Sequence, residues 1–224
     1  MFDTEFFTPQ NGVIYRESVL KAISALQEAL PAKAYSGKSA SELAELLERD
    51  VLPAGESSLA EVVRHLHPVI ANSVVLTHRN TIAHLHCPPL IASLVGEVVL
   101  SALNQSMDSF DQAPAATILE LAVSRWICAE AGLPAGSDAI FTSGATQSNF
   151  MALLLARDVM IASRWSRSVR RQGLPPEAGR LRILCSEVAH FTVEKSLYQL
   201  GLGTDALIKI PVDDSFRMIP DALA

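Results

Sequence analysis

The sequence predicts an α/β protein with a mainly parallel sheet, preceded by an N-terminal helical segment. From residue 138 onward, short apolar runs of strand length alternate with longer runs of helix length. This alternation is typical of βαβ units, which bring parallel strands into one sheet. Before that point the apolar residues recur at helical spacing. We therefore expect a helical segment over 1–75 and the first part of a larger α/β domain over 76–224.

Three helices are predicted in the N-terminal segment, over 15–30, 39–49 and 57–66. The second begins with a Ser-x-x-Glu pattern that is typical of a helix cap. The third is expected to stop near Pro68, because proline lacks the amide hydrogen that a helix interior needs. Together they lack a self-sufficient core, so we expect the segment to pack on another element, such as a second subunit.

The remaining elements follow in chain order. A buried helix is predicted over 89–103 and another helix over 114–132, ending at Gly132. A last helix is expected to begin at Pro220. Between them, the sequence predicts a strand over 139–143, a helix over 146–165, a loop over 173–180, a strand over 181–187, a helix over 191–201 and a strand over 206–212.

Composition and charge exclude several classes of protein. The net charge is −6, and the densest basic stretch, 164–173, reads as the solvated end of a helix rather than a nucleic-acid patch. The apolar stretch 88–103 is interrupted by Glu97 and is too short to span a bilayer. The first ten residues carry no basic stretch of a signal peptide, so the three cysteines are expected to be reduced thiols of a cytoplasmic protein.

The turn FTSGATQSN, residues 141–149, is the first candidate site. It joins a predicted strand to a predicted helix, and ligands of parallel sheets bind beyond the carboxyl ends of the strands. Gly144 and Ala145 leave the backbone amides accessible, Thr146 offers a hydroxyl, and a helix dipole favours an anion. The turn suits a phosphate, although small residues and Ser/Thr caps also serve plain turns.

His190 is the second candidate, because it follows the predicted strand 181–187 and lies at the same sheet edge as the turn. A flat imidazole there could stack on a planar cofactor whose phosphate occupies the turn. The alternative is a structural histidine.

The third candidate is the stretch HRNTIAHLHCPP, residues 78–89, which holds three histidines and a cysteine. The spacing of His84, His86 and Cys87 does not match that of common zinc-ligand pairs. We therefore expect no metal and a loop that lines a polar pocket. The polar stretch 104–114 is either a surface loop or a pocket wall.

Four ordered motifs in the chain resemble a known family. HLHCPP, NQSMDSFDQAPAATILE, FTSGATQSNFMALLLARD and CSEVAHFTVEKS are similar to those of the group II pyridoxal-phosphate decarboxylases, which include the glutamate and aromatic amino-acid decarboxylases. Within this group, the chain most resembles bacterial L-2,4-diaminobutyrate decarboxylases, including those of siderophore pathways. Lysine, aromatic and glutamate-type decarboxylases are the alternatives for the substrate.

The resemblance implies a fold-type I enzyme with pyridoxal 5'-phosphate as cofactor, a small amino acid as substrate, and an obligate homodimer with intertwined N-terminal helices. It implies that Ala145 and Thr146 hold the cofactor phosphate and that His190 stacks on the pyridine ring. The full set of residues that it assigns to the cofactor is Gly144, Ala145, Thr146, Asn149 and His190, and to the substrate His86, Cys87 and Gln112.

The chain departs from the family pattern in two ways. It reads Gly144-Ala145-Thr146 where relatives usually have Gly-Gly-Thr, and we expect the extra methyl group to be tolerated. In such enzymes the lysine that forms the Schiff base with the cofactor, and the aspartate that pairs with its pyridine nitrogen, lie beyond the position of Ala224. Lys195 is the nearest lysine to His190 in sequence, but it reads as a solvent-facing helix residue.

We therefore expect the N-terminal portion of a decarboxylase, with little or no activity as an isolated chain. The alternative is a non-catalytic half-fold that serves in binding or dimerisation.

Overall fold

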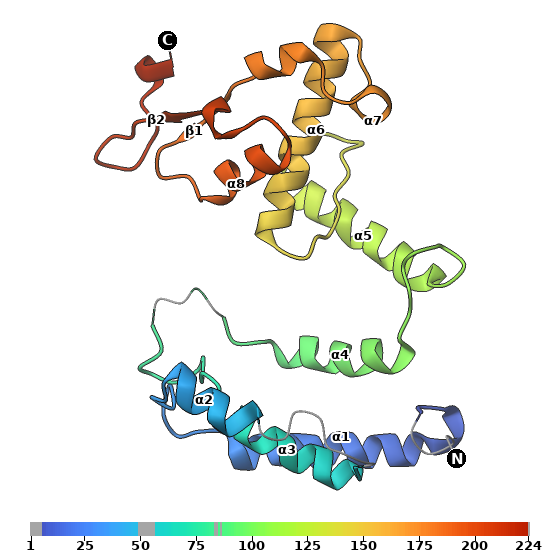
Figure 1. The fold of residues 1–224 in the computed structure, drawn as a ribbon. Coiled ribbons are helices and arrows are strands. Elements are labelled where there is room, and N and C mark those ends of the chain that lie inside the picture. The colour runs from blue at the N-terminus through green and yellow to red at the C-terminus, as the bar shows by residue number, and fades with distance from the viewer. Residues whose placement is uncertain (1–5, 49–56, 83–84, 86, 224) are drawn as a thin grey trace. The chain divides into compact units, whose positions relative to one another are not determined.

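The structure, a computed structural model, describes residues 6–48, 57–82, 85 and 87–223. The chain divides into two compact units, Met1–Pro114 and Ala115–Ala224. Each is described by itself, and Figure 1 shows the elements of both. This division concerns compactness, so the functional boundary expected between residues 75 and 76 stays a prediction.

The first unit holds the three predicted N-terminal helices and one more. The short 3-10 helix Pro9–Asn11 leads into the first of them. The helices are α1 (Gly12–Ala29), α2 (Ala40–Leu47), α3 (Leu59–Ala71) and α4 (Ile91–Leu103).

Reciprocal caps begin α2 and α3. The Ser39 hydroxyl accepts from the Glu42 backbone N–H, and the Glu42 carboxylate accepts from the Ser39 backbone N–H at 2.7 Å. Ser58 and Glu61 repeat the arrangement with the same 2.7 Å bond. Each pair satisfies two amides that a helix N-terminus leaves without a partner, so the Ser-x-x-Glu prediction at 39–42 is confirmed.

The predicted stop near Pro68 is wrong, because α3 continues through this residue to Ala71. Proline removes one intrahelical hydrogen bond, and the carbonyl that loses its donor belongs to Arg64, an exposed residue that water can reach. Beyond the proline, the Asn72 side-chain amide donates to the Pro68 carbonyl at 2.8 Å. The helix therefore ends one turn later, at an asparagine that satisfies its last carbonyls.

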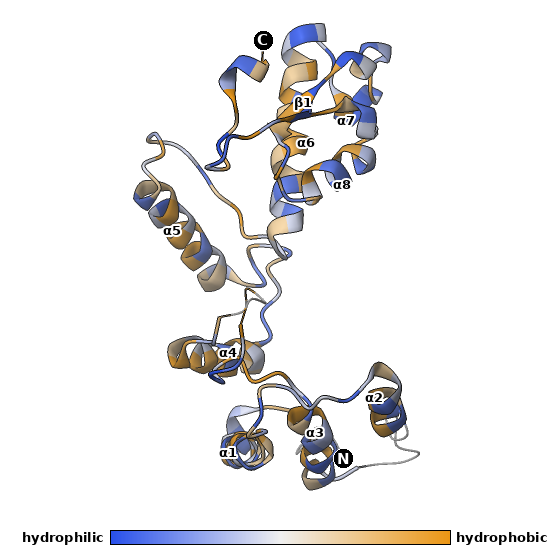
Figure 2. Ribbon diagram, turned by 90° about the vertical axis from the view of Figure 1, so that its left-hand side faces the viewer, coloured by the Kyte–Doolittle hydropathy of each residue, from blue (hydrophilic) through white to orange (hydrophobic). Residues whose placement is uncertain are grey.

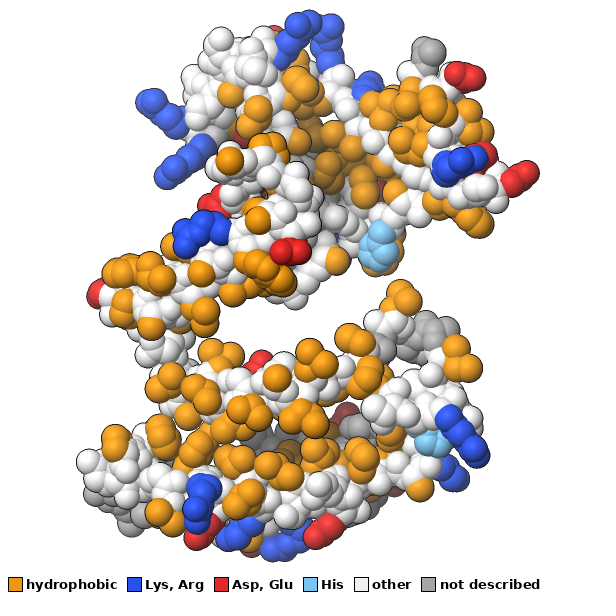
Figure 3. All heavy atoms as spheres, turned by 180° about the vertical axis from the view of Figure 1, so that it is seen from behind, with side chains coloured by type: hydrophobic (Ala, Val, Ile, Leu, Met, Phe, Trp, Pro, Cys, Tyr) orange, Lys and Arg blue, Asp and Glu red, His pale blue; other side chains and the backbone are white. Residues whose placement is uncertain are grey.

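The helix predicted over 89–103 forms as α4, but the prediction that it is buried is wrong. Ile91 is 81% exposed, Val95 61% and Leu103 59%. Figure 2 shows the apolar character of α4, and Figure 3 shows hydrophobic side chains across the surface of the first unit. The apolar composition of a helix predicts that it tends to be buried. Burial also requires other elements that cover the helix, and the described residues of this unit leave α4 exposed.

The second unit contains the predicted βαβ arrangement. Its elements are α5 (Pro114–Glu130, which starts at the unit boundary), α6 (Ala145–Trp165), α7 (Val169–Gln172), the 3-10 helix Pro176–Arg180, β1 (Ile183–Ser186), α8 (Thr192–Gln199), the 3-10 helix Thr204–Ala206, β2 (Leu207–Ile210) and the 3-10 helix Pro220–Leu223.

Strands β1 and β2 pair in parallel, in a register that runs from Ile183 opposite Leu207 to Ser186 opposite Ile210. The chain crosses between them through α8, which packs against α6. Ile161 of α6, Leu197 of α8 and Ile210 of β2 are at most 2% exposed and form the centre of the core. The predicted parallel pair of strands is confirmed.

Two predicted elements differ. Residues 139–143 form no strand in the structure. A strand needs a neighbour to share its hydrogen-bond ladder, and no described segment pairs with these residues. The helix expected from Pro220 is a short 3-10 helix instead.

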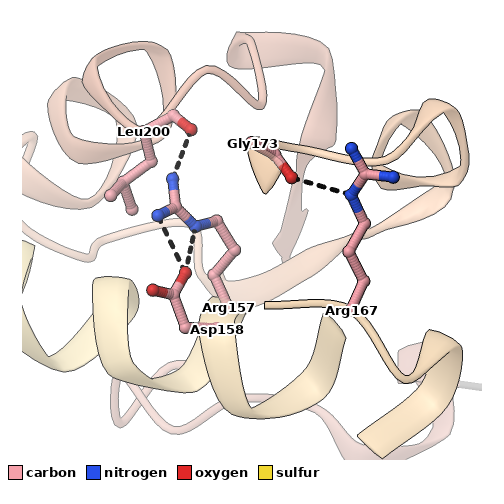
Figure 4. Close-up of polar contacts among 5 residues, drawn as sticks. All are labelled: Arg157, Asp158, Arg167, Gly173 and Leu200. Carbon is pink, nitrogen blue, oxygen red and sulfur yellow. Dashed lines mark hydrogen bonds and ion pairs between the residues drawn. The ribbon is translucent and has the colours of Figure 1, made fainter. Parts of the chain in front are cut away.

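Arg157 links α6 to the end of α8. Its guanidinium donates to the Leu200 carbonyl at 2.7 Å and pairs with the Asp158 carboxylate at 2.8 Å (Figure 4). In the predicted basic stretch, Arg167 donates to the Gly173 carbonyl at 3.0 Å (Figure 4), so this guanidinium holds the chain after α6 rather than a ligand. The Arg157 contact with Leu200 links α6 to the end of α8, and these are the two helices beside the candidate site.

The chain exposes far more surface than its mass requires. Its accessible area is 17346 Å², whereas two independent compact domains of half its mass would expose roughly 12,000 Å² in total. Apolar residues of α1 such as Val13 (63% exposed) and Leu20 (55%) contribute to this excess, which supports the prediction that the N-terminal helices lack a self-sufficient core.

Candidate cofactor site

The turn before α6 depends on Gly144. This residue is the N-cap of α6, with φ 155° and ψ 173°, a region that is essentially restricted to glycine. A Cβ at this position would meet no atom within 4 Å, so backbone conformation rather than crowding selects glycine. The Thr142 hydroxyl donates to the Gly144 carbonyl at 3.0 Å and lies 2.7 Å from the Ser148 hydroxyl.

A second set of contacts folds the turn back onto α6. The Ser143 backbone N–H and hydroxyl both donate to the Gln147 side-chain oxygen, at 2.9 and 2.7 Å. The backbone N–H groups of Gln147 and Ser148 donate to the Gly144 carbonyl. In the part of the chain that the structure describes, the N–H groups of Ala145 and Thr146 contact no acceptor. Two free donors at the positive end of a helix dipole are suited to an anion.

A cavity of ≈ 670 Å³ opens beside this helix terminus. It is lined by Ser143, Thr146, Gln147 and Phe150 from the turn and α6, and by Gln199 from α8. Thr146, whose N–H is one of the two free donors, is exposed. The donor set and the open approach fit the phosphate of pyridoxal 5'-phosphate.

His190 follows β1 and precedes α8, as predicted, and its side chain is exposed. One face of the ring lies against Phe191, with ring centroids 4.2 Å apart and planes 34° apart. Nδ1 lies 2.9 Å from the Thr192 hydroxyl and accepts the Thr192 backbone N–H at 3.3 Å. The imidazole is thus held at one edge and one face.

The structure brings Asn149 and His190 together through Thr192. The Asn149 side-chain amide donates to the Thr192 hydroxyl at 2.8 Å. This bond connects α6 to α8 across 43 residues of sequence. Sequence reasoning did not single out Thr192. Its only sequence signal is its position two residues after His190, where a threonine can bond a neighbouring group.

The predicted substrate residues belong to the first unit by sequence, whereas the turn and His190 belong to the second. His86 falls outside the described residues, Cys87 is exposed, and Gln112 is exposed in the loop after α4. In that loop the Ser109 hydroxyl donates to the Asp111 carboxylate at 2.6 Å, which lowers the pKa of Asp111. The substrate roles of these residues therefore stay predictions.

Among the described residues, no three histidine, cysteine or acidic side chains gather as metal ligands. His84 and His86 lie outside this set, so the expectation of no metal stays a prediction. None of the described helices is long and apolar enough to cross a bilayer. Lys195 is exposed on α8, as expected from the sequence.

The conserved domain of pyridoxal-dependent decarboxylases matches residues 41–224, which is most of the chain. The chain belongs to this family. Membership confirms the predicted group of pyridoxal-phosphate decarboxylases, which are carboxy-lyases, and the predicted cofactor of the family.

The curated relatives include decarboxylases of different amino acids. An L-2,4-diaminobutyrate decarboxylase of Acinetobacter baumannii is 38% identical over 91% of this chain and 41% of that enzyme. A cysteine sulfinic acid decarboxylase of Mus musculus is 30% identical over 95% of this chain and 40% of that enzyme. The chain spans about two fifths of the length of these relatives.

Solved structures confirm the predicted fold class. The glutamate decarboxylase domain of a diaminobutyrate-pyruvate transaminase and L-2,4-diaminobutyrate decarboxylase from Vibrio parahaemolyticus aligns with a TM-score of 0.94 and 34% identity. The alignment covers 99% of this chain and 50% of that one. Mouse CSAD aligns with a TM-score of 0.80 and 26% identity, over 97% of this chain and 45% of that one.

Proposed function

We propose that the protein acts in the pyridoxal-phosphate-dependent decarboxylation of L-2,4-diaminobutyrate to 1,3-diaminopropane. In this proposal the present chain supplies the part of the site that holds the cofactor's phosphate and the face of its ring. The observation that carries the proposal is the pair of free amides at Ala145 and Thr146, because Thr146 lines the same cavity as Gln199 of α8. Family membership supports it.

Each site residue has a distinct task. Gly144 turns the backbone so that the first amides of α6 face an anion, and Thr146 adds a hydroxyl donor. His190 offers the ring face that Phe191 does not cover. When bound, the cofactor supplies an electron sink for the charge left on the substrate after CO2 departs.

The choice of substrate comes from the relatives. Two L-2,4-diaminobutyrate decarboxylases are 37 to 38% identical to the chain, compared with 28 to 30% for the cysteine sulfinic acid enzymes. The alternatives are the lysine, aromatic and glutamate-type decarboxylases.

We also propose that the chain associates with a second copy of itself through its N-terminal helices. The exposed apolar residues of α1, such as Val13 (63% exposed) and Leu20 (55%), support this, because an extensive exposed apolar surface marks an interaction site. The free thiols of all three cysteines support a location in the cytoplasm, whose reducing conditions keep thiols unpaired.

Cofactor binding is the direct test. The quenching of tryptophan fluorescence is measured while the chain is titrated with pyridoxal 5'-phosphate or with pyridoxal, which lacks the phosphate. We expect the phosphate ester to bind more tightly. Thr146→Val should weaken its binding by about 10-fold or more, the usual effect of losing a hydrogen bond to a charged group, and should leave the binding of pyridoxal unchanged.

Thr204→Val, an exposed threonine of the same unit, is the matched control and should change neither affinity. Equal affinities for the two compounds would remove the phosphate site from the proposal.

Decarboxylation is tested separately as CO2 release from L-2,4-diaminobutyrate. The second unit has two lysines: Lys195 is exposed on α8, and Lys209 pairs with Glu194 at 3.3 Å. We therefore expect little or no CO2 from the chain alone, measured beside an intact diaminobutyrate decarboxylase. Release at a rate comparable with that enzyme would show that this chain contains a complete site.

A further inference from the structure

The contacts between Asn149, Thr192 and His190 specify a direction of hydrogen bonding. The fixed point is the Thr192 backbone N–H, which can only donate and lies 3.3 Å from Nδ1 of His190. Nδ1 must therefore present a lone pair. In a neutral imidazole the single proton is then on Nε2.

The Thr192 hydroxyl agrees with this direction. It accepts from the Asn149 side-chain amide at 2.8 Å, which leaves its own hydrogen to donate to Nδ1 at 2.9 Å. Hydrogen bonds thus run from Asn149 to Thr192 and from Thr192 to His190. In the described part of the chain Nε2 contacts no acceptor, so its N–H faces outward from the exposed ring.

Thr192 is held firmly enough to impose this arrangement. It is 0% exposed, at the first position of α8. The Ser196 hydroxyl donates to its backbone carbonyl at 2.7 Å. A buried hydroxyl cannot exchange its partners for water, so both of its hydrogen bonds are costly to break.

We propose that Thr192 and Asn149 are positioning residues that hold His190 as the Nε2–H tautomer, so that the ring offers an N–H donor to a bound ligand. The inference rests on the proposed function for the identity of that ligand, the cofactor with its amino-acid substrate. The tautomer itself is a property of the chain alone. His190 then does more than cover the cofactor ring, because its outer edge recognises an acceptor atom.

The test is nuclear magnetic resonance of the chain labelled with ¹⁵N-histidine, at a pH well above the usual range of histidine titration. His190→Gln identifies the resonances of His190 among the six histidines. In the wild type we expect an unprotonated Nδ1 and a protonated Nε2. A predominantly protonated Nδ1 would overturn the proposal.

Asn149→Asp reverses the polarity of the contact, because a carboxylate can only accept. The Thr192 hydroxyl should turn toward it, and the ratio of Nε2–H to Nδ1–H should fall by roughly 2- to 10-fold, as expected for one hydrogen bond. Thr192→Val should lower the ratio similarly, whereas Thr192→Ser retains the hydroxyl and should restore it. An unchanged ratio in Asn149→Asp would refute the proposed direction, even if Thr192→Val fails to fold.

No cofactor is present in these spectra. Failure of the tautomer prediction is therefore distinguished from failure of cofactor binding, which the titration with pyridoxal 5'-phosphate measures. Thr204→Val is again the control and should leave the His190 resonances in place.

Discussion

Gly144→Ala tests whether the candidate phosphate site depends on a backbone conformation. A Cβ at residue 144 would touch nothing within 4 Å, so the cost of alanine comes from the backbone at φ 155° and ψ 173°. Holding a non-glycine residue there costs about 1–3 kcal/mol. Gly179→Ala provides the control, because Gly179 is also uncrowded and lacks a positive φ. The control measures the gain from a less flexible unfolded chain, about 0.4–1 kcal/mol.

The energetic cost of alanine should appear either in the stability of the second unit or in its affinity for the cofactor. If the turn is retained, the second unit should lose about 1–3 kcal/mol of unfolding free energy relative to Gly179→Ala. If the turn relaxes instead, the binding-competent form becomes scarce and the affinity for pyridoxal 5'-phosphate should fall by about 5- to 150-fold.

Urea unfolding followed by tryptophan fluorescence isolates this unit, because Trp126 and Trp165 both lie within it. Cofactor affinity is titrated in parallel. The reasoning fails if the two variants differ by less than about 0.5 kcal/mol in stability and also bind the cofactor equally well.

Two further predictions concern stability. Ile161→Ala leaves a cavity at a fully buried position of α6 and should lower the free energy of unfolding by about 2–5 kcal/mol. Leu155→Ala, at a 59% exposed position of the same helix, should lower it much less. Similar urea midpoints for both variants would contradict the assigned core. The Ser58 hydroxyl and backbone N–H hold the pKa of Glu61 below its ordinary 4.5, so this carboxylate stabilises α3 above that pH and the contribution is lost as the pH falls through the lowered value. Glu61→Gln keeps a hydrogen-bond acceptor but cannot titrate. The difference in unfolding free energy between wild type and variant should therefore shrink as the pH is lowered. A difference that stays constant with pH would argue against the cap.

Local sequence patterns predicted most helices because their signals lie within a few residues. The run after Gly144 gave the start of α6 within one residue, and the Ser-x-x-Glu pattern located the start of α2. The predicted helix stop near Pro68 was wrong, because the cost of a missing amide hydrogen depends on whether water can bond the carbonyl that loses its donor. Residue spacing does not show this.

Features that depend on distant partners were harder to predict. Residues 139–143 have the composition of a strand, yet a strand exists only with a neighbour to pair with. The apolar pattern of α4 predicted burial without specifying what would cover it. The bond between Asn149 and Thr192 joins residues 43 positions apart, so no local pattern contains it.

The large accessible surface also affects how the chain should respond to heat and denaturant. An unfolded chain of this mass exposes roughly 35,000 Å², so folding to 17346 Å² removes only about half of that surface from solvent, compared with about 70% for a compact domain of similar length. The heat-capacity change and the urea dependence of unfolding both scale with the surface exposed. Both should therefore be about 70% of the values for a compact chain of this length, giving a flatter stability curve and a broader urea transition. An association that covers α4 would increase both the heat-capacity change and the urea dependence of unfolding.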